Sequence, residues 1–456
     1  MNNKTLIGIV AVVAVVALVG AGCVVVFNNN GGNNDDFTAT TRLLVYGNAN
    51  EDNYLDDKDV AFIGDIADGK ATWDKEKNPF ADANNDGKVD AADKALVQKF
   101  IKGEKAEMLY KNWYGEVCSV HYPVAGPIAG TMVQTLDLCY IVGAYNDVVG
   151  IKDNAATIAT YNPMLYPGAA EKIKTVRGDT NVFDVSKMLA LGVKTVIGDT
   201  AAQTPEFIKS ITTADPEVNC IQLPMNRVVN NVDWTYTIVT LGVMMNHQSA
   251  TKAYIDYLND VEKALAKKLD ALKDKDPLTF NIAYRLGETS STTTNIDTEG
   301  TGAVQYGDCM NMLKLGLKSK IKSSVADGYL RDYPVQDLLA ANPDIIFVET
   351  WNMISTTMTE TEYMDVLKYR VDLVSESGAY ENNRVITMAY EIYGTIPAAS
   401  GLFAMGHLIW PDVFSEEEGI NFLNDYMRNF TQAGKTFDVR EHLGFAPMLW
   451  GKDIKN

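Results

Sequence analysis

Two twelve-residue segments, residues 48–59 and 82–93, carry oxygen-bearing side chains at matching positions. Positions 1, 3, 5, 9 and 12 of each segment are Asn or Asp, and position 8 is aliphatic. A hard cation such as Ca²⁺ takes six to eight oxygen ligands, and alternate side chains of a tight loop converge on one point. The spacing therefore predicts two calcium sites. The predicted ligands are Asn48, Asn50, Asp52, Tyr54, Asp56 and Asp59 in the first loop and Asp82, Asn84, Asp86, Lys88, Asp90 and Asp93 in the second.

One helix is expected after each loop, over residues 60–67 and 94–102, and position 12 is Asp where Glu is usual. Together with the duplication, these features resemble a type I dockerin module built on EF-hand-type loops. The resemblance implies about two bound Ca²⁺ ions and a cohesin-like partner domain. A calcium-stapled spacer or a clamp between domains is the alternative. Gly87 supplies the sharp turn of the second loop and Asn53 replaces it in the first, so the second loop is predicted to be the more secure site.

A second internal repeat lies further along the chain, where residues 185–200 align without a gap on residues 335–350. Each copy predicts a short helix, a turn, a buried strand, and an acid and a Thr at the end of that strand. A helix that leads into a buried strand is half of a parallel α/β unit. The duplication therefore predicts two similar lobes that face each other and bind a ligand between them.

The composition narrows the function further. The 456 residues suit two or three domains, and the 46% hydrophobic content is that of a globular protein. A formal charge of −19 argues against binding to nucleic acid or to anionic lipid. The cysteines form no CxxC pair, so zinc and redox motifs lack support. Cys118, Cys139, Cys220 and Cys309 are left open between buried thiols and disulfides.

The N-terminus predicts attachment to a membrane. Residues 6–27 are uncharged and apolar, about 33 Å long as a helix at 1.5 Å per residue, and Lys4 precedes them. By the positive-inside rule, the rest of the chain lies on the outer face of the cytoplasmic membrane. The segment is either an uncleaved anchor helix or a lipoprotein signal cleaved before Cys23; the apolar residues after Cys23 favour the anchor. The Asn-, Gly- and Asp-rich residues that follow predict a flexible spacer.

Residues 136–151 resemble the "LLxALGAxDxVVGV" stretch of substrate-binding proteins for ABC importers of the iron-siderophore, haem and cobalamin type. Residues 335–350 resemble the "LLALxPDxVI" element of the same family, with Pro343 and Asp344 retained. Residues 384–388 and 401–414 also match its pattern. The resemblance covers roughly residues 113–450.

This family implies an α/β fold of two similar parallel-sheet lobes joined by one long helix. Asn231 is the expected cap of that helix, and a second amphipathic helix is expected from Ser249. A single stiff helix permits only modest closure on ligand. The predicted divisions are a membrane segment (1–27), a spacer (28–42), a small all-α dockerin-like module (43–106), lobe 1 (113–229), the linking helix (230–250) and lobe 2 (251–456).

In parallel α/β lobes, ligand-binding side chains come from the loops that follow the strands. Aromatic rings there would pack against a macrocycle, and an Arg would pair with a carboxylate or an anionic iron complex. The predicted ligand-binding residues are Gln134, Thr135, Tyr161, Tyr166, Asp199, Thr200, Arg285, Trp351, Tyr390 and Tyr393. With 22 tyrosines in the chain, packing is the alternative role of each Tyr. The family docks on its permease through an exposed Glu on each lobe, for which the candidates are Glu206, and Glu360 or Glu362.

The sequence therefore predicts a tethered extracytoplasmic solute-binding protein that is not an enzyme and that delivers a metal chelate to an ABC permease. No GxxxxGK motif followed by Ser or Thr occurs, so the ATPase must be a separate chain. Siderophore, haem, corrinoid and chelated nickel or cobalt all remain open as cargo. The alternative function is a surface adhesion or scaffold protein that acts through its dockerin-like module. An enzyme is disfavoured because no nucleophile–base pair or cluster-ligating Cys pattern is visible.

Overall fold

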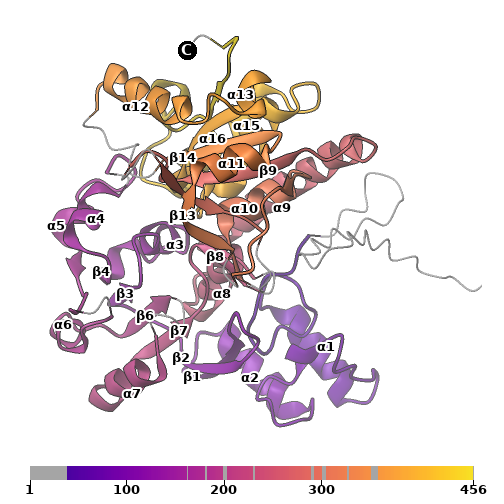
Figure 1. Ribbon diagram of the computed structural model, residues 1–456. Helices are drawn as coiled ribbons and strands as arrows, with labels where there is room; N and C mark the ends of the chain where they lie inside the picture. Colours follow the sequence, from indigo (N-terminus) through magenta and orange to yellow (C-terminus); the bar gives the residue numbers. More distant parts are fainter. Residues whose placement is uncertain are drawn as a thin grey trace, which may run out of the picture.

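The chain folds as two lobes, each built on a sheet, with a small helical module beside them (Figure 1). The computed structural model describes residues 39–161, 163–179, 182–198, 203–229, 232–288, 292–299, 304–325, 328–350 and 358–454. The predicted N-terminal membrane segment lies outside these ranges. Within them, no helix is long and apolar enough to cross a membrane.

Lobe 1 is built on a five-stranded sheet of order β5-β4-β3-β6-β7, in which all neighbouring strands are parallel. The strands are β3 (Ile128–Gly130), β4 (Val148–Ile151), β5 (Lys174–Thr175), β6 (Thr195–Gly198) and β7 (Asn219–Gln222). The connecting helices are α3 (Thr135–Ile141), η2 (Tyr145–Asp147), α4 (Ala155–Thr160), α5 (Ala169–Lys172), α6 (Val185–Ala190) and α7 (Pro205–Ala214). All residues of β3 and β6 are buried, as expected for the centre of a parallel sheet.

Lobe 2 is built on a seven-stranded mixed sheet of order β13-β10-β9-β14-β15-β16, in which β12 also pairs with β9. Its strands are β9 (Thr279–Tyr284), β10 (Thr293–Asp297), β12 (Lys318–Ser319), β13 (Tyr329–Pro334), β14 (Ile345–Thr350), β15 (Val385–Ala389) and β16 (Met448–Trp450). Its helices are α10 (Gly307–Lys314), α11 (Val335–Ala341), α12 (Glu360–Asp372), α13 (Gly378–Glu381), α14 (Tyr390–Tyr393), α15 (Ala398–Ile409), α16 (Glu416–Phe430) and η3 (Val439–Glu441).

The expectation of two parallel sheets is correct for lobe 1 and for the centre of lobe 2, where β9, β14 and β15 are parallel. The outer strands β10, β13 and β16 run antiparallel. The connection between β9 and β10 is short. A short connection can join only antiparallel neighbours, because parallel neighbours need a longer crossover.

The duplicated helix–strand element is confirmed in both lobes. In lobe 1 it forms α6 and β6, and in lobe 2 it forms α11 and β14. Each strand lies inside its sheet, β6 between β3 and β7, and β14 between β9 and β15. The helix, Gly turn and strand predicted over residues 136–151 are also present, as α3, Gly143 with φ 73°, and β4.

Two consecutive helices link the lobes: the family resemblance implied one long helix, and the sequence predicted that a second helix begins at Ser249. They are α8 (Trp234–Met244) and α9 (Gln248–Leu272), so the link extends well beyond residue 250. Asn246 separates them with a left-handed φ of 57°, a conformation that ends a helix. The cap of α8 is Asp233 rather than Asn231, because the Asp233 side chain accepts a hydrogen bond from the Thr235 main chain. A short ribbon of β8 (Arg227–Val229) and β11 (Val304–Tyr306) adds a second connection between the lobes.

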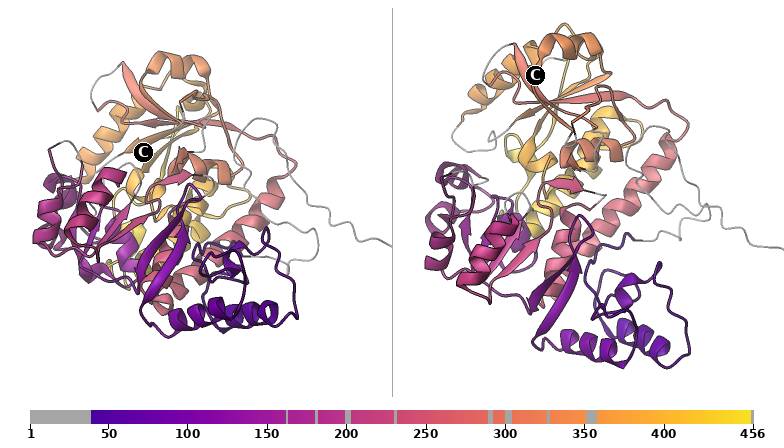
Figure 2. Two further views of the ribbon diagram at one scale, coloured as in Figure 1. Left: turned by 90° about the horizontal axis from the view of Figure 1, so that it is seen from below. Right: turned by 60° about the horizontal axis from the view of Figure 1, so that its bottom comes forward.

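The module contains α1 (Asp57–Ala67), η1 (Pro79–Ala81) and α2 (Ala91–Ile101), and a hairpin of β1 (Ala106–Lys111) and β2 (Val117–Tyr122) joins it to lobe 1. Both views of Figure 2 show the module at one end of the molecule beside this hairpin. The predicted helices after each loop are thus present as α1 and α2. Each begins with a capping box, formed by Asp56 with Asp59 and by Asp90 with Asp93.

A continuous apolar core runs from the module through the linking helices into both lobes. It includes Val45 and Val97 of the module, Leu136 of lobe 1, and Phe280 and Phe347 of lobe 2. The four cysteines of the described residues, Cys118, Cys139, Cys220 and Cys309, are free thiols. The fold is therefore held by packing rather than by disulfides in this part of the chain.

Candidate functional site

The first predicted calcium loop closes around a buried, incompletely bonded oxygen. Asn48 is buried, and its Nδ2 donates to the carbonyl oxygens of Leu43 (3.3 Å) and Asp52 (2.9 Å). Its Oδ1 is buried without a hydrogen-bond partner. Leaving such an acceptor unpaired costs about 1–3 kcal/mol. An unpaired oxygen at position 1 of the loop is what a cation ligand requires.

Asp59, at position 12 of the same loop, is also buried. Its Oδ1 accepts from the main-chain nitrogens of Ala49 (2.8 Å) and Asn50 (3.2 Å), and its Oδ2 accepts from Asp56 (2.9 Å). Burial raises the pKa of Asp59 to about 6, against the lowering effect of these hydrogen bonds. A bound cation would favour the charged form of this carboxyl group.

The second loop has matching geometry. Asp82 accepts from the main-chain nitrogens of Asp86 (3.0 Å) and Gly87 (2.8 Å), and Asp93 accepts from Asn84 (3.1 Å) and Asp90 (2.8 Å). Gly87 adopts the expected positive φ of 94°. Asn53, its counterpart, instead bonds the Arg42 nitrogen and the Thr40 carbonyl oxygen through its side chain.

The residues of both loops fit Ca²⁺, with Asn and main-chain oxygens adding to the carboxylates. Within the described ranges, no group of three or more His, Cys, Asp or Glu side chains is arranged to hold a metal ion, so these side chains would not be sufficient ligands by themselves. The ligands would be those named from the spacing, and Ca²⁺ would supply charge neutralisation and cross-linking of the loop. Calcium binding itself stays a prediction.

The first loop is bonded directly to the linking helices. Gln248, the first residue of α9, donates from Nε2 to the Leu55 carbonyl oxygen (3.1 Å) and accepts at Oε1 from the Leu55 nitrogen (2.8 Å). Arg42 is buried, and its Nε donates to Thr235 Oγ1 on α8 (2.8 Å) while its guanidinium pairs with Glu262 on α9. The loop and the helices that join the lobes therefore form one bonded unit.

Two predicted ligand-binding tyrosines of lobe 1 converge on a carboxyl group that the sequence analysis did not select. Tyr161 and Tyr166 donate to the two oxygens of Asp137, at 2.6 and 2.7 Å. All three side chains are buried. Burial raises the pKa of Asp137 to about 6, although both hydroxyl groups favour its charged form. The structure thus places both tyrosines in packing around α3, and their contact with cargo stays a prediction.

Asp137 has a testable effect on stability. Its folded-state pKa of about 6 exceeds the ordinary 3.8, so the folded state binds more protons between these values. The group therefore favours folding below about pH 4 and loses this contribution as the pH rises through 6. Relative to Asp137→Asn, the wild type should gain on the order of 3 kcal/mol of unfolding free energy between pH 7.5 and 4.

Urea unfolding at both pH values measures this gain. Asp179→Asn, which changes an exposed carboxyl group of the same lobe, should keep the pH dependence of the wild type. Equal pH dependence in the wild type and Asp137→Asn would contradict the assignment.

The remaining predicted ligand residues of the described ranges lie in different surroundings. Thr135 donates to the Met132 carbonyl oxygen (2.6 Å), and Tyr393 donates to that of Phe445 (2.9 Å). Gln134 precedes α3 and is buried, with no hydrogen-bond partner for Oε1. Arg285 is about half exposed, has a positive φ of 59°, and pairs with Glu288 (2.8 Å).

Tyr390 forms a bond between the lobes. It is buried, and its hydroxyl oxygen accepts from Nδ2 of Asn226, which follows β7 of lobe 1, at 3.1 Å. Its ring lies 5.7 Å from that of Tyr284. This hydrogen bond places Tyr390, a predicted ligand-binding residue, where the two lobes meet. Asp199, Thr200 and Trp351 lie outside the described residues.

Lobe 2 holds buried acids that the sequence analysis did not assign to the site. They are Asp297, Asp308, Glu349 and Glu391, each about 1% exposed. Of these acids, the sequence analysis noted Glu349 alone, as the acid at the end of a repeated strand. It occupies the position that Asp199 has in the first copy of the repeat.

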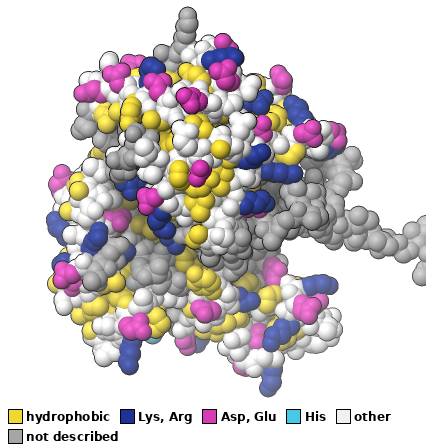
Figure 3. Space-filling model, viewed as in Figure 1, with side chains coloured by type: hydrophobic (Ala, Val, Ile, Leu, Met, Phe, Trp, Pro, Cys, Tyr) yellow, Lys and Arg dark blue, Asp and Glu magenta, His cyan; other side chains and the backbone are white. Residues whose placement is uncertain are grey.

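The candidate docking residues are exposed on both lobes. Glu206 lies in the first turn of α7, and Glu360 and Glu362 lie in the first turn of α12. Glu362 already accepts from the Thr359 nitrogen (2.8 Å), which lowers its pKa. Glu206 and Glu360 are the candidate docking residues that do not cap a helix. On the face shown in Figure 3, acidic and basic side chains are interspersed.

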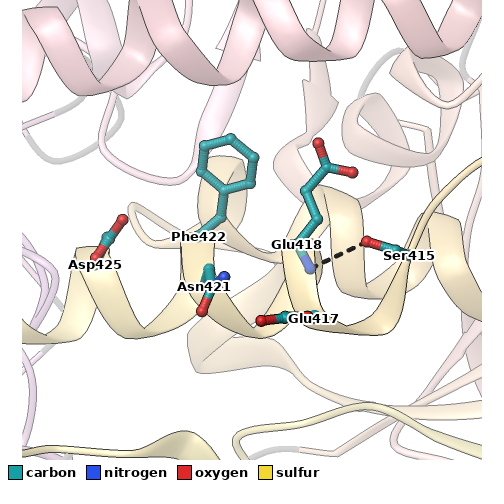
Figure 4. Close-up of a pocket in the computed structure, with 6 residues that line it drawn as sticks. All are labelled: Ser415, Glu417, Glu418, Asn421, Phe422 and Asp425. Carbon is teal, nitrogen blue, oxygen red and sulfur yellow. Dashed lines mark hydrogen bonds between the residues drawn. The ribbon is translucent and has the colours of Figure 1, made fainter.

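One pocket of about 520 Å³ lies along α16 and is shown in Figure 4. Its lining residues all come from this helix and its cap: Ser415, Glu417, Glu418, Asn421, Phe422 and Asp425. Glu418 pairs with Lys268 of the neighbouring α9 at 2.7 Å. Because a small-molecule site normally draws groups from several elements, this acidic groove does not have the character of a cargo site.

Comparison with known proteins establishes the fold. No family model and no curated protein matches the chain. Among solved structures, the TroA-like periplasmic binding protein FepB from Veillonella parvula matches with a TM-score of 0.53 at 12% identity, covering 75% of this chain and 99% of that one. MolA of Haemophilus influenzae, bound to molybdate, matches with a TM-score of 0.51 at 17% identity, covering 71% and 97%.

CeuE of Helicobacter pylori, described in complex with Ni-His, matches with a TM-score of 0.50 at 17% identity, covering 71% of this chain and 95% of that one. The two lobes braced by α8 and α9 therefore have the fold of periplasmic solute-binding proteins.

Proposed function

We propose that the protein is an extracytoplasmic solute-binding protein that captures a metal chelate and delivers it to an ABC permease powered by a separate ATPase. The observation that carries this proposal is the fold, two sheets centred on matching helix–strand elements and braced by α8 and α9. MolA bound to molybdate and CeuE in complex with Ni-His have similar folds, which supports a metal-containing cargo without selecting one. Siderophore, haem and corrinoid remain the alternatives.

In this proposal the N-terminal segment tethers the protein to the outer face of the cytoplasmic membrane, and Glu206 and Glu360 contact the permease. The lobes would move little on binding. Their shared core and the Asn226–Tyr390 hydrogen bond support this modest closure.

The cargo test uses protein purified from its source without chelators. We expect one equivalent of a non-calcium metal per chain, measured by elemental mass spectrometry, with an absorbance spectrum that identifies the chelate class. Protein stripped of cargo and returned to the extracted chelate should show saturable quenching of tryptophan fluorescence. Absence of both retained metal and quenching would refute the proposal.

The module suggests a second function, because it is bonded to the same helices that join the lobes. We infer that it acts as an internal calcium clamp, supported by the paired hydrogen bonds between Leu55 and Gln248. Binding of a cohesin-like domain, and with it an adhesion or scaffold role, is the alternative. The clamp predicts that calcium stabilises the whole chain, as developed in the Discussion.

A further inference from the structure

A network of largely buried charges connects the first calcium loop with both linking helices and with lobe 2. Arg42 lies just before the loop in the chain. Its Nε donates to Thr235 Oγ1 of α8 at 2.8 Å, and its guanidinium pairs with Glu262 of α9. The Thr235 hydroxyl group in turn donates to Asp233, and Asp233 pairs with Lys314 of α10 at 3.5 Å. The network therefore reaches from the module to a helix of lobe 2.

The positive and negative charges of this network depend on one another. Arg42 and Asp233 are 5% and 8% exposed. Burial alone would raise the pKa of Asp233, but Lys314 and then Arg42 outweigh burial and lower that pKa. Both cations therefore act on the same carboxylate. Displacing either cation would leave a buried charge less well compensated, which is unfavourable, so the position of Lys314 is coupled energetically to that of Arg42.

The first loop holds the segment that carries Arg42. Asn53, at position 6 of the loop, accepts at Oδ1 from the Arg42 main-chain nitrogen (2.6 Å). Asn48, at position 1, donates from Nδ2 to the Leu43 carbonyl oxygen (3.3 Å), and its buried Oδ1 has no hydrogen-bond partner. A cation bound at that oxygen would fix Asn48, and with it the main chain next to Arg42.

The second loop is bonded differently. The Asp82 side chain accepts from the main-chain nitrogens of Asp86 and Gly87, and the Asp93 side chain accepts from those of Asn84 and Asp90. These partners all lie inside the second loop itself. Of the two predicted calcium sites, the first is therefore the one whose ligands contact the network.

Lys314 ends α10, a helix at the junction of the lobes. α10 follows directly on β11, which pairs with β8, and it contacts β8 as well (Figure 1). Asn226, directly before β8, donates to the Tyr390 hydroxyl group of lobe 2 at 3.1 Å. Asn311 of α10 donates to the carbonyl oxygen of Tyr393, in the same short helix as Tyr390, at 3.1 Å. A shift of α10 would therefore disturb the contacts between the lobes.

We propose that the first calcium loop is an effector site, where bound Ca²⁺ fixes Arg42 and, through Asp233 and Lys314, holds α10 and the contacts between the lobes in one arrangement. Because linkage between binding sites is reciprocal, a cargo that contacts both lobes in this arrangement would also tighten calcium binding at this loop. This inference rests on the proposed function and adds a regulator to it.

Hydrogen–deuterium exchange of the full chain tests this restraint with Ca²⁺ as the probe. With Ca²⁺ in place of a chelator, the main-chain amides of β8, β11 and α10 should exchange more slowly by about fivefold or more, the lower end of typical coupling between sites. The effect should vanish in Asn48→Ala with Asp59→Ala and persist in Asp82→Ala with Asp93→Ala. The reference segment is α12, on the opposite side of the molecule from the module, and its amides should change less (Figure 1).

A substitution in lobe 2 tests the same coupling in the other direction. Lys314→Met removes the charge that pairs with Asp233 and should weaken calcium binding at the first loop by about fivefold. Calorimetry in the background of Asp82→Ala with Asp93→Ala isolates this site. Lys318→Met is the matched control, because it removes the same charge from an exposed position on β12 of the same lobe and should leave the affinity unchanged.

Slower exchange confined to the module and α9, or equal slowing in α12, would overturn the inference. Equal calcium affinity in Lys314→Met and the control would overturn it as well, and so would a first loop that binds no calcium. None of these results touches the proposed function, because cargo capture is decided separately by the non-calcium metal retained in natively purified protein.

Discussion

Arg42→Ala should lower the free energy of unfolding by about 3–5 kcal/mol, because removing one partner of a buried ion pair leaves the other charge uncompensated. Arg42 is buried between the module and the linking helices, where it pairs with Glu262 and bonds Thr235. The substitution should therefore weaken the body as well as the module. Urea unfolding measures the loss of unfolding free energy. It should be the same whether unfolding is followed by tryptophan fluorescence or by circular dichroism.

A matched control separates this effect from a general charge effect. Lys58→Ala removes an exposed pair with Asp52, for which 0–1 kcal/mol is expected. The double variant Arg42→Met with Glu262→Leu should recover most of the stability, since it replaces both members of the pair by apolar side chains, and Asp233 nearby keeps its pair with Lys314. A loss below 1 kcal/mol in Arg42→Ala would show that the network does not join the module to the helices.

Calcium should stabilise the entire chain. At about 100 times the dissociation constant, a ligand that binds only the folded state adds about 2.7 kcal/mol per site. Because Leu55 of the first loop is bonded to Gln248 at the start of α9, this gain should appear in the unfolding of the lobes. Calorimetric titration should find two sites, and thermal unfolding should shift upward with calcium.

Loop variants assign the two sites. Asp82→Ala with Asp93→Ala should remove the second site, and Asn48→Ala with Asp59→Ala should remove the first. Asp57→Ala, an exposed residue in the first turn of α1, serves as the control and should retain both. A flat titration of the wild type would end the calcium assignment, and a gain confined to the module would end the clamp.

The central elements of both lobes could be predicted because their signals are local. The repeated helix and strand of residues 185–200 and 335–350 rest on periodicity within sixteen residues, which survives whatever surrounds it. The helices after each calcium loop are local in the same way, because their capping boxes span four residues.

The break between the two linking helices was predicted, since a second helix was expected from Ser249 and α9 begins at Gln248. Asn246 lies between the two helices with a left-handed φ of 57°, a conformation that ends a helix. The antiparallel outer strands of lobe 2, by contrast, were not predicted. β16 joins its sheet from residues 448–450, and no local pattern indicates that distant partner.

The candidate site shows the same limit. Tyr161 and Tyr166 were selected as ligand residues from their place after strands, yet their hydroxyl groups bond Asp137, which lies 24 and 29 residues earlier in the chain. Arg285 was expected to meet an anionic cargo; it pairs with Glu288, and its contact with cargo stays a prediction. Glu349, near the end of β14, is buried. Burial of an acid cannot be inferred from a strand of six residues.

Lobe 1 is completed by segments far downstream of it. The Gln432 nitrogen donates to the Leu165 carbonyl oxygen (3.2 Å), and Tyr426 and Met427 of α16 share the core with Tyr161 and Tyr166. During synthesis, the first lobe therefore emerges well before α16 (Glu416–Phe430), the helix that covers its apolar side. Transient exposure of such surfaces favours aggregation. The native state of lobe 1 therefore cannot be complete before α16 has been synthesised, so folding of the chain would depend on chaperones that keep the early segments apart.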